Sequence, residues 1–275
     1  MQEAQQEKLQ WFEEALRMAS HPTTKKLQSV LNIKLSDDIE AAFSMVGHLY
    51  NDKDRSSPFY EVQHRDVPNN EGAYFYDLFT MGVREGLRSA YYFLLQFLHL
   101  TEMVKREAAT IVAEVKPSHS GSLGIPAPTL NANYEGFMLM SRATLDRLNH
   151  AIKYYYQISP KKRISNLYQL VDELNRNYTD NPRTSGLIKA INRHNTYLSV
   201  QFAGQDRATE RNRLAHQEYV EFALPNIMYS SEGFIRVVLM YHGDLPTDAS
   251  EELTNRFNRL KLFILDILNE FFGTV

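Results

Sequence analysis

The sequence AYFYDLFTMGVREGLRSAYYFLLQFLHLTEMVKREAATIVAEV, residues 73–115, is the longest helical run in the chain and decides the fold class. It has few helix breakers apart from Gly82 and Gly86, and it ends before Pro117. Its most apolar part, residues 90–100, is about half as long as a membrane-spanning helix and is flanked by charged residues. We therefore expect these residues to form the buried turns of a long helix in a bundle.

Helical spacing continues on both sides of this run. We expect further helices over 3–19, from Ser36 to about Tyr50, over 133–158, over 166–175, from Leu187 to Ala203, and after Asp248. Residues 51–72 are rich in turn formers and predict a long loop. The turn-like SSEG at 230–233 lies between two stretches of β-branched and aromatic residues, which predicts a hairpin.

The predicted fold class is all-α, a multi-helix bundle with a small β-hairpin insertion before the C-terminal helix. We divide the chain into a helical N-terminal extension, residues 1–70, and a bundle over 71–275. The composition is ordinary for a globular protein, with 43% hydrophobic and 23% charged residues. The polar N-terminal helix has no apolar signal region, so we expect a cytoplasmic protein that makes no contact with a membrane.

Charge and cysteine content exclude several kinds of site. A formal net charge of -3 argues against a broad basic surface for duplex DNA, although a local basic cleft stays possible. The absence of cysteine excludes disulfides, thiolate nucleophiles, iron–sulfur clusters and cysteine-based zinc sites. The chain also has no phosphate-loop, dinucleotide-binding, zincin or nucleophile-elbow motif.

One short stretch, TERNRLAHQE at 209–218, carries candidate chemistry. Asp206 is placed to cap a helix through it, and on that helix Asn212 and His216 are i, i+4 neighbours. Arg211 lies at the edge of the same face, within reach of a phosphate over the imidazole. Two further arginines make this the densest basic cluster in the chain: Arg207 and Arg213.

These residue types suit RNA cleavage without a metal ion or cofactor. The fork of donors on Arg211 matches phosphate oxygens, and its charge stabilises a phosphorane-like transition state. His216 can take a proton from a ribose 2′-hydroxyl or give one to the leaving oxygen, while Asn212 orients the histidine or holds a phosphate. Arg207 and Arg213 then bind RNA. The alternative is that the stretch is only the solvated face of a bundle helix.

Other histidine pairings are weaker. His99 with Glu102 comes nearest to a metal-ligand pair, and a partner helix would have to complete it, so we predict no metal site. Arg236 and His242 repeat the Arg–His spacing. They fall in the predicted hairpin without a polar residue after the arginine, so we interpret them as structural.

The stretch Arg211-Asn212-Arg213-Leu214-Ala215-His216 resembles the signature of the HEPN superfamily, which is Arg, a polar residue, three residues and His. FMLMSRATLDRLNHAI at 137–152 is similar to a Ser-Arg-x-x-Leu-Asp helix of such domains. The resemblance implies a helical RNA-binding or RNA-cleaving domain that forms a homodimer with two motifs in one cleft. Active members are metal-independent ribonucleases, often toxins with an antitoxin or effectors of phage defence. Inactive members bind RNA, a nucleotide or a protein.

Two further features have a structural and a functional interpretation. Arg142 and Asp146 are i, i+4 neighbours, so a helix salt bridge is expected. The functional alternative is that Arg142 contributes to the RNA cleft. The tyrosines at 154–156 can pack or stack on bases. Three successive residues cannot share one helix face, so we favour packing.

Overall fold

The computed structural model describes residues 33–51, 57–64, 71–123, 127–159, 161–162, 164, 167–198, 225–239 and 247–273. The chain divides into two compact units, Met1–Leu35 and Ser36–Val275. The boundary between these units falls inside the predicted N-terminal extension, residues 1–70. In this unit the elements are α3 (Asp37–Asn51), α4 (Pro58–Gln63), α5 (Glu71–Asp77), π-helix η1 (Leu78–Arg84), α6 (Glu85–Val115), β1 (Gly121–Ser122), α7 (Pro128–Tyr155), α8 (Leu167–Asn177), α9 (Thr184–Leu198), β2 (Pro225–Tyr229), β3 (Ile235–Leu239), β4 (Thr247–Asp248) and α11 (Ala249–Phe272).

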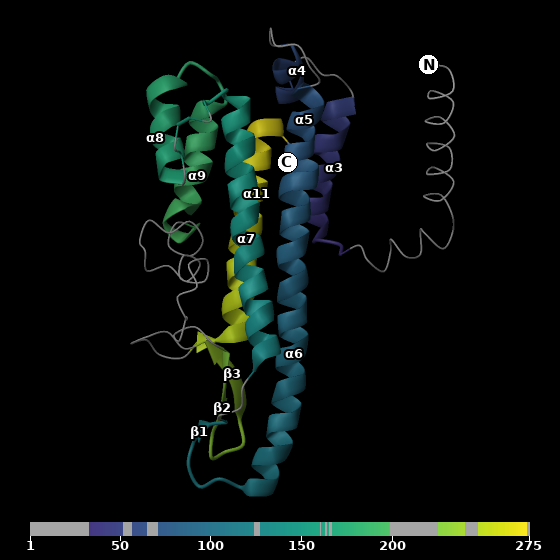
Figure 1. Ribbon diagram of the computed structural model, residues 1–275, viewed down its shortest axis with the longest axis vertical. Coiled ribbons are helices and arrows are strands. Elements are labelled where there is room, and N and C mark those ends of the chain that lie inside the picture. Colours follow the sequence, from purple (N-terminus) through teal and green to yellow (C-terminus); the bar gives the residue numbers. More distant parts are fainter. Residues whose placement is uncertain are drawn as a thin grey trace, which may run out of the picture. The chain divides into compact units, whose positions relative to one another are not determined.

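The predicted fold class is confirmed. Long helices form a bundle, and a small antiparallel sheet precedes the last helix (Figure 1). Helices α6 and α7 lie side by side along most of their length, and α11 packs against α3, α6 and α9 (Figure 1). Within the described residues, no helix combines the length and the apolar character needed to cross a membrane.

The run at 73–115 is helical throughout but is not one α-helix. Between α5 and α6 the backbone forms the π-helix η1, with Phe79, Thr80 and Val83 buried. A π-helix is rare and widens the turn by one residue. The Thr80 hydroxyl donates to the carbonyl oxygen of Tyr76 at 3.1 Å, which satisfies one backbone acceptor in this region. Hydrophobic spacing alone did not reveal this change of helix type.

Helices α6 and α7 approach each other closely at two glycines. A Cβ atom on Gly86 of α6 would lie 2.6 Å from the Thr144 hydroxyl oxygen on α7. A Cβ on Gly136 of α7 would lie 2.5 Å from ring carbons of Phe93 on α6. Both distances are shorter than side chains tolerate, so the small residues permit this packing.

Aromatic side chains form the core where α4, α5, η1, α7 and α11 meet. Phe75 and Phe79 lie with ring centroids 5.3 Å apart, and Phe79 lies 5.0 Å from Phe272. Tyr155 and Tyr156 are also buried, while Tyr154 is half-buried. Packing at 154–156 is therefore confirmed for two of the three tyrosines.

Hydrogen bonds join this core to the surface around Tyr155. The Tyr155 hydroxyl donates to a carboxylate oxygen of Glu61 on α4. Arg183, just before α9, donates to the other Glu61 oxygen at 3.0 Å and to the carbonyl oxygen of Phe271 at 2.7 Å. The network ties α4, α7, α9 and α11 together, and Thr184 adds a 3.0 Å bond to the Tyr156 hydroxyl.

Several predicted boundaries differ from the structure, and among them α9 begins at Thr184 rather than at Leu187. The loop expected over 51–72 contains helix α4, because Ser57 caps its N-terminus by accepting from the amide of Tyr60, and Pro58 suits the first turn. The helix expected from Asn133 begins at Pro128 instead. The Asn133 side chain donates back to the Thr129 carbonyl at 2.8 Å, so it lies inside α7 rather than capping it.

The predicted hairpin is confirmed as β2 and β3, which pair antiparallel with Ile227 opposite Val237 and Met228 opposite Arg236. Their loop includes Gly233, whose φ of 87° is the left-handed conformation that such a turn requires. Strands β1 and β4 extend the sheet to four strands. Asp248 caps α11 as expected, by accepting from the amides of Ser250 and Glu251.

Candidate functional site

The predicted catalytic residues lie outside the described residues. Arg211, Asn212 and His216 fall between the end of α9 at Leu198 and the start of β2 at Pro225, and so do the predicted RNA-binding residues Arg207 and Arg213. Their roles stay predictions from the sequence. Arg142 is the one candidate of this set whose side chain the structure places.

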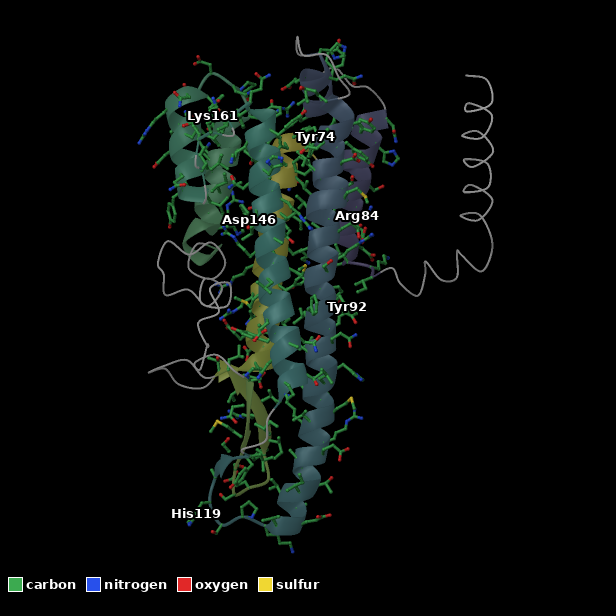
Figure 2. All side chains as sticks on the ribbon, viewed as in Figure 1. Tyr74, Arg84, Tyr92, His119, Asp146 and Lys161 are labelled. Atoms are coloured by element: carbon green, nitrogen blue, oxygen red, sulfur yellow. The ribbon has the colours of Figure 1, made fainter. Side chains whose placement is uncertain are left out.

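Arg142 is a buried arginine on α7. Its Nε donates to Asp146 Oδ2 at 3.0 Å, and its Nη2 lies 2.8 Å from Asp146 Oδ1. The expected i, i+4 salt bridge is therefore present and bidentate, with the Asp146 carboxylate half-exposed. Figure 2 labels Asp146 on α7. Burial of a guanidinium is costly without such a partner. The pair anchors Arg142 within the bundle, while contact of Arg142 with RNA stays a prediction.

A second buried arginine, Arg256 on α11, was not predicted. Its Nε donates to Glu252 Oε1 at 2.8 Å, one helical turn away, and its Nη1 reaches Met138 Sδ at 3.6 Å. Met138 precedes Arg142 by one turn of α7, so both guanidinium groups lie in the same region of the bundle. The Glu252–Arg256 spacing was a usable signal, but it is common on exposed helix faces.

Polar groups also meet on the surface where α5 and η1 contact α7. The hydroxyl of Tyr74, which is labelled in Figure 2, lies 3.2 Å from His150 Nε2. Arg147 Nη1 donates to the Gly82 carbonyl at 3.2 Å. Burial lowers the pKa of His150, and the positive charge of Lys153 lowers it further. The imidazole is therefore mainly neutral at pH 7. Residues 76 positions apart form this contact, so local spacing could not predict it.

A histidine–aspartate pair joins α9 to α11. His194 Nε2 lies 2.8 Å from Asp266 Oδ2, and Arg193 Nη1 lies 2.6 Å from the same oxygen. The carboxylate fixes the orientation of the imidazole, an arrangement used both in cores and by general bases. The packing of α9 on α11 brings these side chains together, which the sequence did not indicate.

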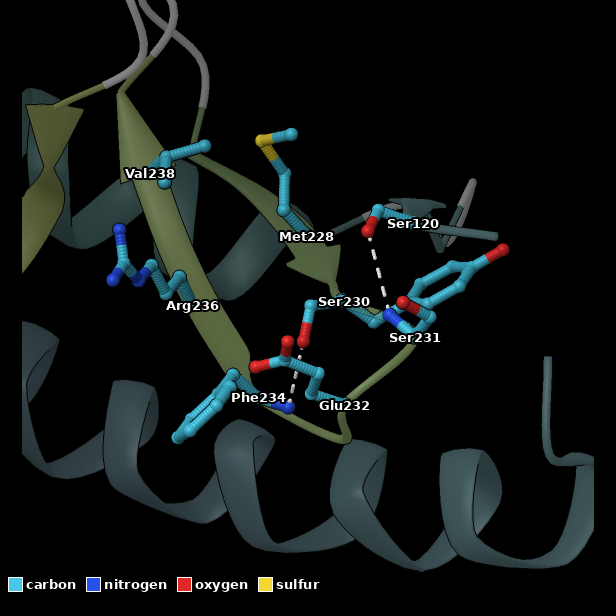
Figure 3. Close-up of a pocket in the computed structure, with 9 residues that line it drawn as sticks. Ser120, Met228, Ser230, Ser231, Glu232, Phe234, Arg236 and Val238 are labelled. Carbon is cyan, nitrogen blue, oxygen red and sulfur yellow. Dashed lines mark hydrogen bonds between the residues drawn. The ribbon is translucent and has the colours of Figure 1, made fainter. Parts of the chain in front are cut away.

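The sheet carries a hollow of about 540 Å³ at the tip of its hairpin (Figure 3). Its lining combines serine hydroxyls, a carboxylate, a guanidinium and apolar side chains: Ser120, Met228, Tyr229, Ser230, Ser231, Glu232, Phe234, Arg236 and Val238. We had interpreted Arg236 as structural, and the structure places it at this hollow with its side chain exposed. His242, which forms the Arg–His spacing with Arg236 in the sequence, lies outside the described residues.

Metal-ligating side chains do not gather in the described part of the chain. In those ranges no three His, Cys, Asp or Glu side chains form a group that could hold a metal ion. Glu102, the proposed neighbour of His99, accepts from Lys105 Nζ at 3.1 Å. That carboxylate is therefore engaged in a surface ion pair along α6.

The buried arginines, the surface polar pairs and the hairpin hollow are among the chemistry-bearing features of the described residues. Comparison of the chain with family models, with curated proteins and with solved structures finds no match.

Proposed function

We propose that the protein is a metal-independent endoribonuclease of the HEPN type, with Arg211 and His216 at its active site. The observation that carries this proposal is the sequence Arg-Asn-x-x-x-His at 211–216 within a helical protein. The mostly helical fold supports it, because the resemblance places the motif on a helix of an α-bundle.

The motif contains the side chains that transesterification of RNA requires: an acid–base group and a group that stabilises negative charge. The His216 imidazole takes the proton from a ribose 2′-hydroxyl, and the 2′-oxygen attacks the adjacent phosphorus. Arg211 donates to the non-bridging phosphate oxygens as negative charge builds on them. The bond to the 5′-oxygen breaks, that oxygen takes a proton from an imidazolium, and a 2′,3′-cyclic phosphate is left. Asn212 holds the imidazole or a phosphate oxygen in position.

A homodimer completes this proposal, because the resemblance implies two motifs facing one cleft. The same resemblance favours a cytoplasmic toxin or defence effector that acts on RNA and is restrained by an antitoxin or another defence-system protein. Arg207 and Arg213 supply additional phosphate contacts beside the motif, and Arg142 is proposed to support the cleft from α7. Contacts of this kind add affinity that falls with salt.

The test is cleavage of single-stranded RNA by the purified chain in excess EDTA. Cleavage should persist in EDTA, and His216→Ala should lower its rate by about 10²–10⁴-fold, the usual contribution of general acid–base catalysis. His119→Ala is the matched control, because His119 is exposed on the loop after α6 and should leave the rate unchanged. Full activity of His216→Ala would refute the assignment.

Binding measurements separate the enzyme from its main rival, a catalytically inactive module that binds RNA, a nucleotide or a protein. RNA affinity that falls with salt and on Arg211→Ala, without cleavage by the wild-type chain, would identify such a module. Arg176→Ala, at an exposed arginine on α8, controls for the general loss of one positive charge.

A further inference from the structure

The two faces of the β2–β3 hairpin differ in what covers them. Side chains alternate between the faces of a strand. Ile227, Val237 and Leu239 are buried, and both strands contact the long helices. On the opposite face lie Phe234, just before β3, then Arg236 and Val238, at every second position. Val238 is buried at the base of this face, whereas the other two lie at the tip of the hairpin. Their side chains are exposed, that of Phe234 by 65%. An exposed ring next to a guanidinium is a surface suited to a ligand.

Phe234, Arg236 and Glu232 belong to the lining of one hollow, whose volume of about 540 Å³ is in the usual range for small-molecule sites. Figure 3 shows Arg236 on β3 and Phe234 just before it, with Glu232 and Ser231 at the turn and Ser120 on the neighbouring segment. Two serine oxygens already accept backbone bonds. Ser230 Oγ accepts from the amide of Phe234 at 3.1 Å, and Ser120 Oγ accepts from the amide of Ser231 at 3.3 Å. Each hydroxyl keeps its own O–H as a donor.

This combination matches the parts of an unpaired nucleotide. Aromatic side chains stack on unpaired bases, and arginine recognises phosphate through its fork of donors. An ionised carboxylate only accepts hydrogen bonds, so it selects a base edge that presents donors. Guanine offers two adjacent donors, N1–H and the N2 amino group, on its Watson–Crick edge.

We propose that the hairpin hollow binds an unpaired guanine nucleotide, with the base on Phe234, its donor edge on Glu232 and the phosphate on Arg236. The inference rests on the proposed action on RNA, and it names a base preference for that substrate. Free guanosine monophosphate and a guanosine within single-stranded RNA present the same base and phosphate, so both are used as probes.

The first arm locates binding by NMR of ¹³C-methyl-labelled methionines while GMP, AMP, CMP or UMP is added. GMP should shift the Met228 signal at the lowest concentration, because Met228 lines the hollow. Met81, which is 69% exposed on the π-helix, is the internal control and should not move. Met228→Leu assigns the signal. No shift with any nucleotide, or equal shifts with all four, would overturn the proposal.

The second arm measures affinity for GMP and for a short guanosine-containing RNA. Phe234→Ala should weaken both by about 5-fold to 150-fold, the range found for loss of one base-stacking side chain. Tyr92→Ala removes another exposed ring, on α6, and should change neither. Glu232→Gln should abolish the preference for GMP over AMP, while Glu114→Gln preserves it.

The salt dependence of RNA binding tests the arginine. Arg236→Gln should reduce the slope of RNA affinity against salt concentration by the amount expected for about one phosphate contact. Arg176→Gln should leave that slope unchanged.

Cleavage assays on the same proteins separate this proposal from the ribonuclease assignment. If GMP did not shift the Met228 signal while the chain still cleaved RNA, the proposed nucleotide site would be overturned and the ribonuclease assignment would stand. A GMP-specific shift at Met228 without any cleavage by the wild-type chain would support the nucleotide site and overturn the ribonuclease. Because Phe234 is exposed, its removal should leave the circular dichroism spectrum unchanged, and the Met228 shift in the wild-type chain tests the site without any substitution in the hollow.

Discussion

Substitution of Gly86 by alanine tests the close approach of α6 to α7. The added Cβ would lie 2.6 Å from Thr144 Oγ1 and 3.0 Å from Arg147 Nη1. Thr144 is fully buried and donates to the Met140 carbonyl at 2.8 Å, so its hydroxyl cannot move without losing that bond. Overpacking costs about 1–3 kcal/mol, and a lost hydrogen bond costs about 0.5–1.5 kcal/mol. The higher helix propensity of alanine compared with glycine offsets about 1 kcal/mol of this cost.

The net loss in the free energy of unfolding is therefore roughly 0.5–3.5 kcal/mol. For a domain of this size each kcal/mol lowers Tm by about 2–4 °C. Gly82→Ala is the matched control, because its Cβ would have no neighbour nearer than 3.8 Å. That substitution should be neutral or stabilising by up to about 1 kcal/mol. Urea denaturation followed by circular dichroism measures both. Equal midpoints for the two variants would refute the close helix contact.

Two other predictions concern buried polar groups. Burial raises the pKa of Tyr156 to about 12, above the ordinary tyrosine value of 10.0, so the stabilising contribution is complete below pH 10 and is lost as the pH rises toward 12. Tyr156→Phe should therefore reduce the loss of stability, seen as a fall in the urea midpoint, between pH 10 and pH 12. An unchanged fall in this variant would contradict the prediction. Asp146→Asn removes the ionic partner of buried Arg142 and should lower the free energy of unfolding by about 1–3 kcal/mol. Asp172→Asn, on an exposed face of α8, should have little effect in the same urea titration.

Local signals in the sequence predicted most of the fold. The hairpin followed from SSEG between two apolar stretches, and the start of α11 followed from the capping side chain of Asp248. Helix α4 was missed because its six residues lie among turn formers. Its stability comes from packing of Phe59 on Phe75 and Phe272, and those contacts are distant in sequence. Short helices depend on tertiary packing more than on their own propensity.

The chemistry-bearing residues were harder to predict for the same reason. The Arg142–Asp146 salt bridge is local and could be derived from i, i+4 spacing. The pairing of His194 with Asp266 depends on how α9 packs on α11, and no local pattern encodes it. At the hairpin, the alternation of Phe234 and Arg236 on the strand face away from the core was a usable signal. The spacing of Arg236 from His242 does not reveal this pattern, because it leaves out the ring of Phe234, two residues before the arginine.

The π-helix η1 sets a phase difference between the two α-helical segments that it joins. Each residue of an α-helix turns the chain by about 100°, so one residue more or fewer rotates everything beyond it by that angle. If η1 lost one residue and became an α-helix, α5 would turn relative to α6, and Phe75 would leave the aromatic core while Gly86 still faced Thr144. The length of the segment from Leu78 to Arg84 is therefore constrained more tightly than its composition, and single-residue deletions there should be tolerated less well than substitutions at exposed positions such as Met81.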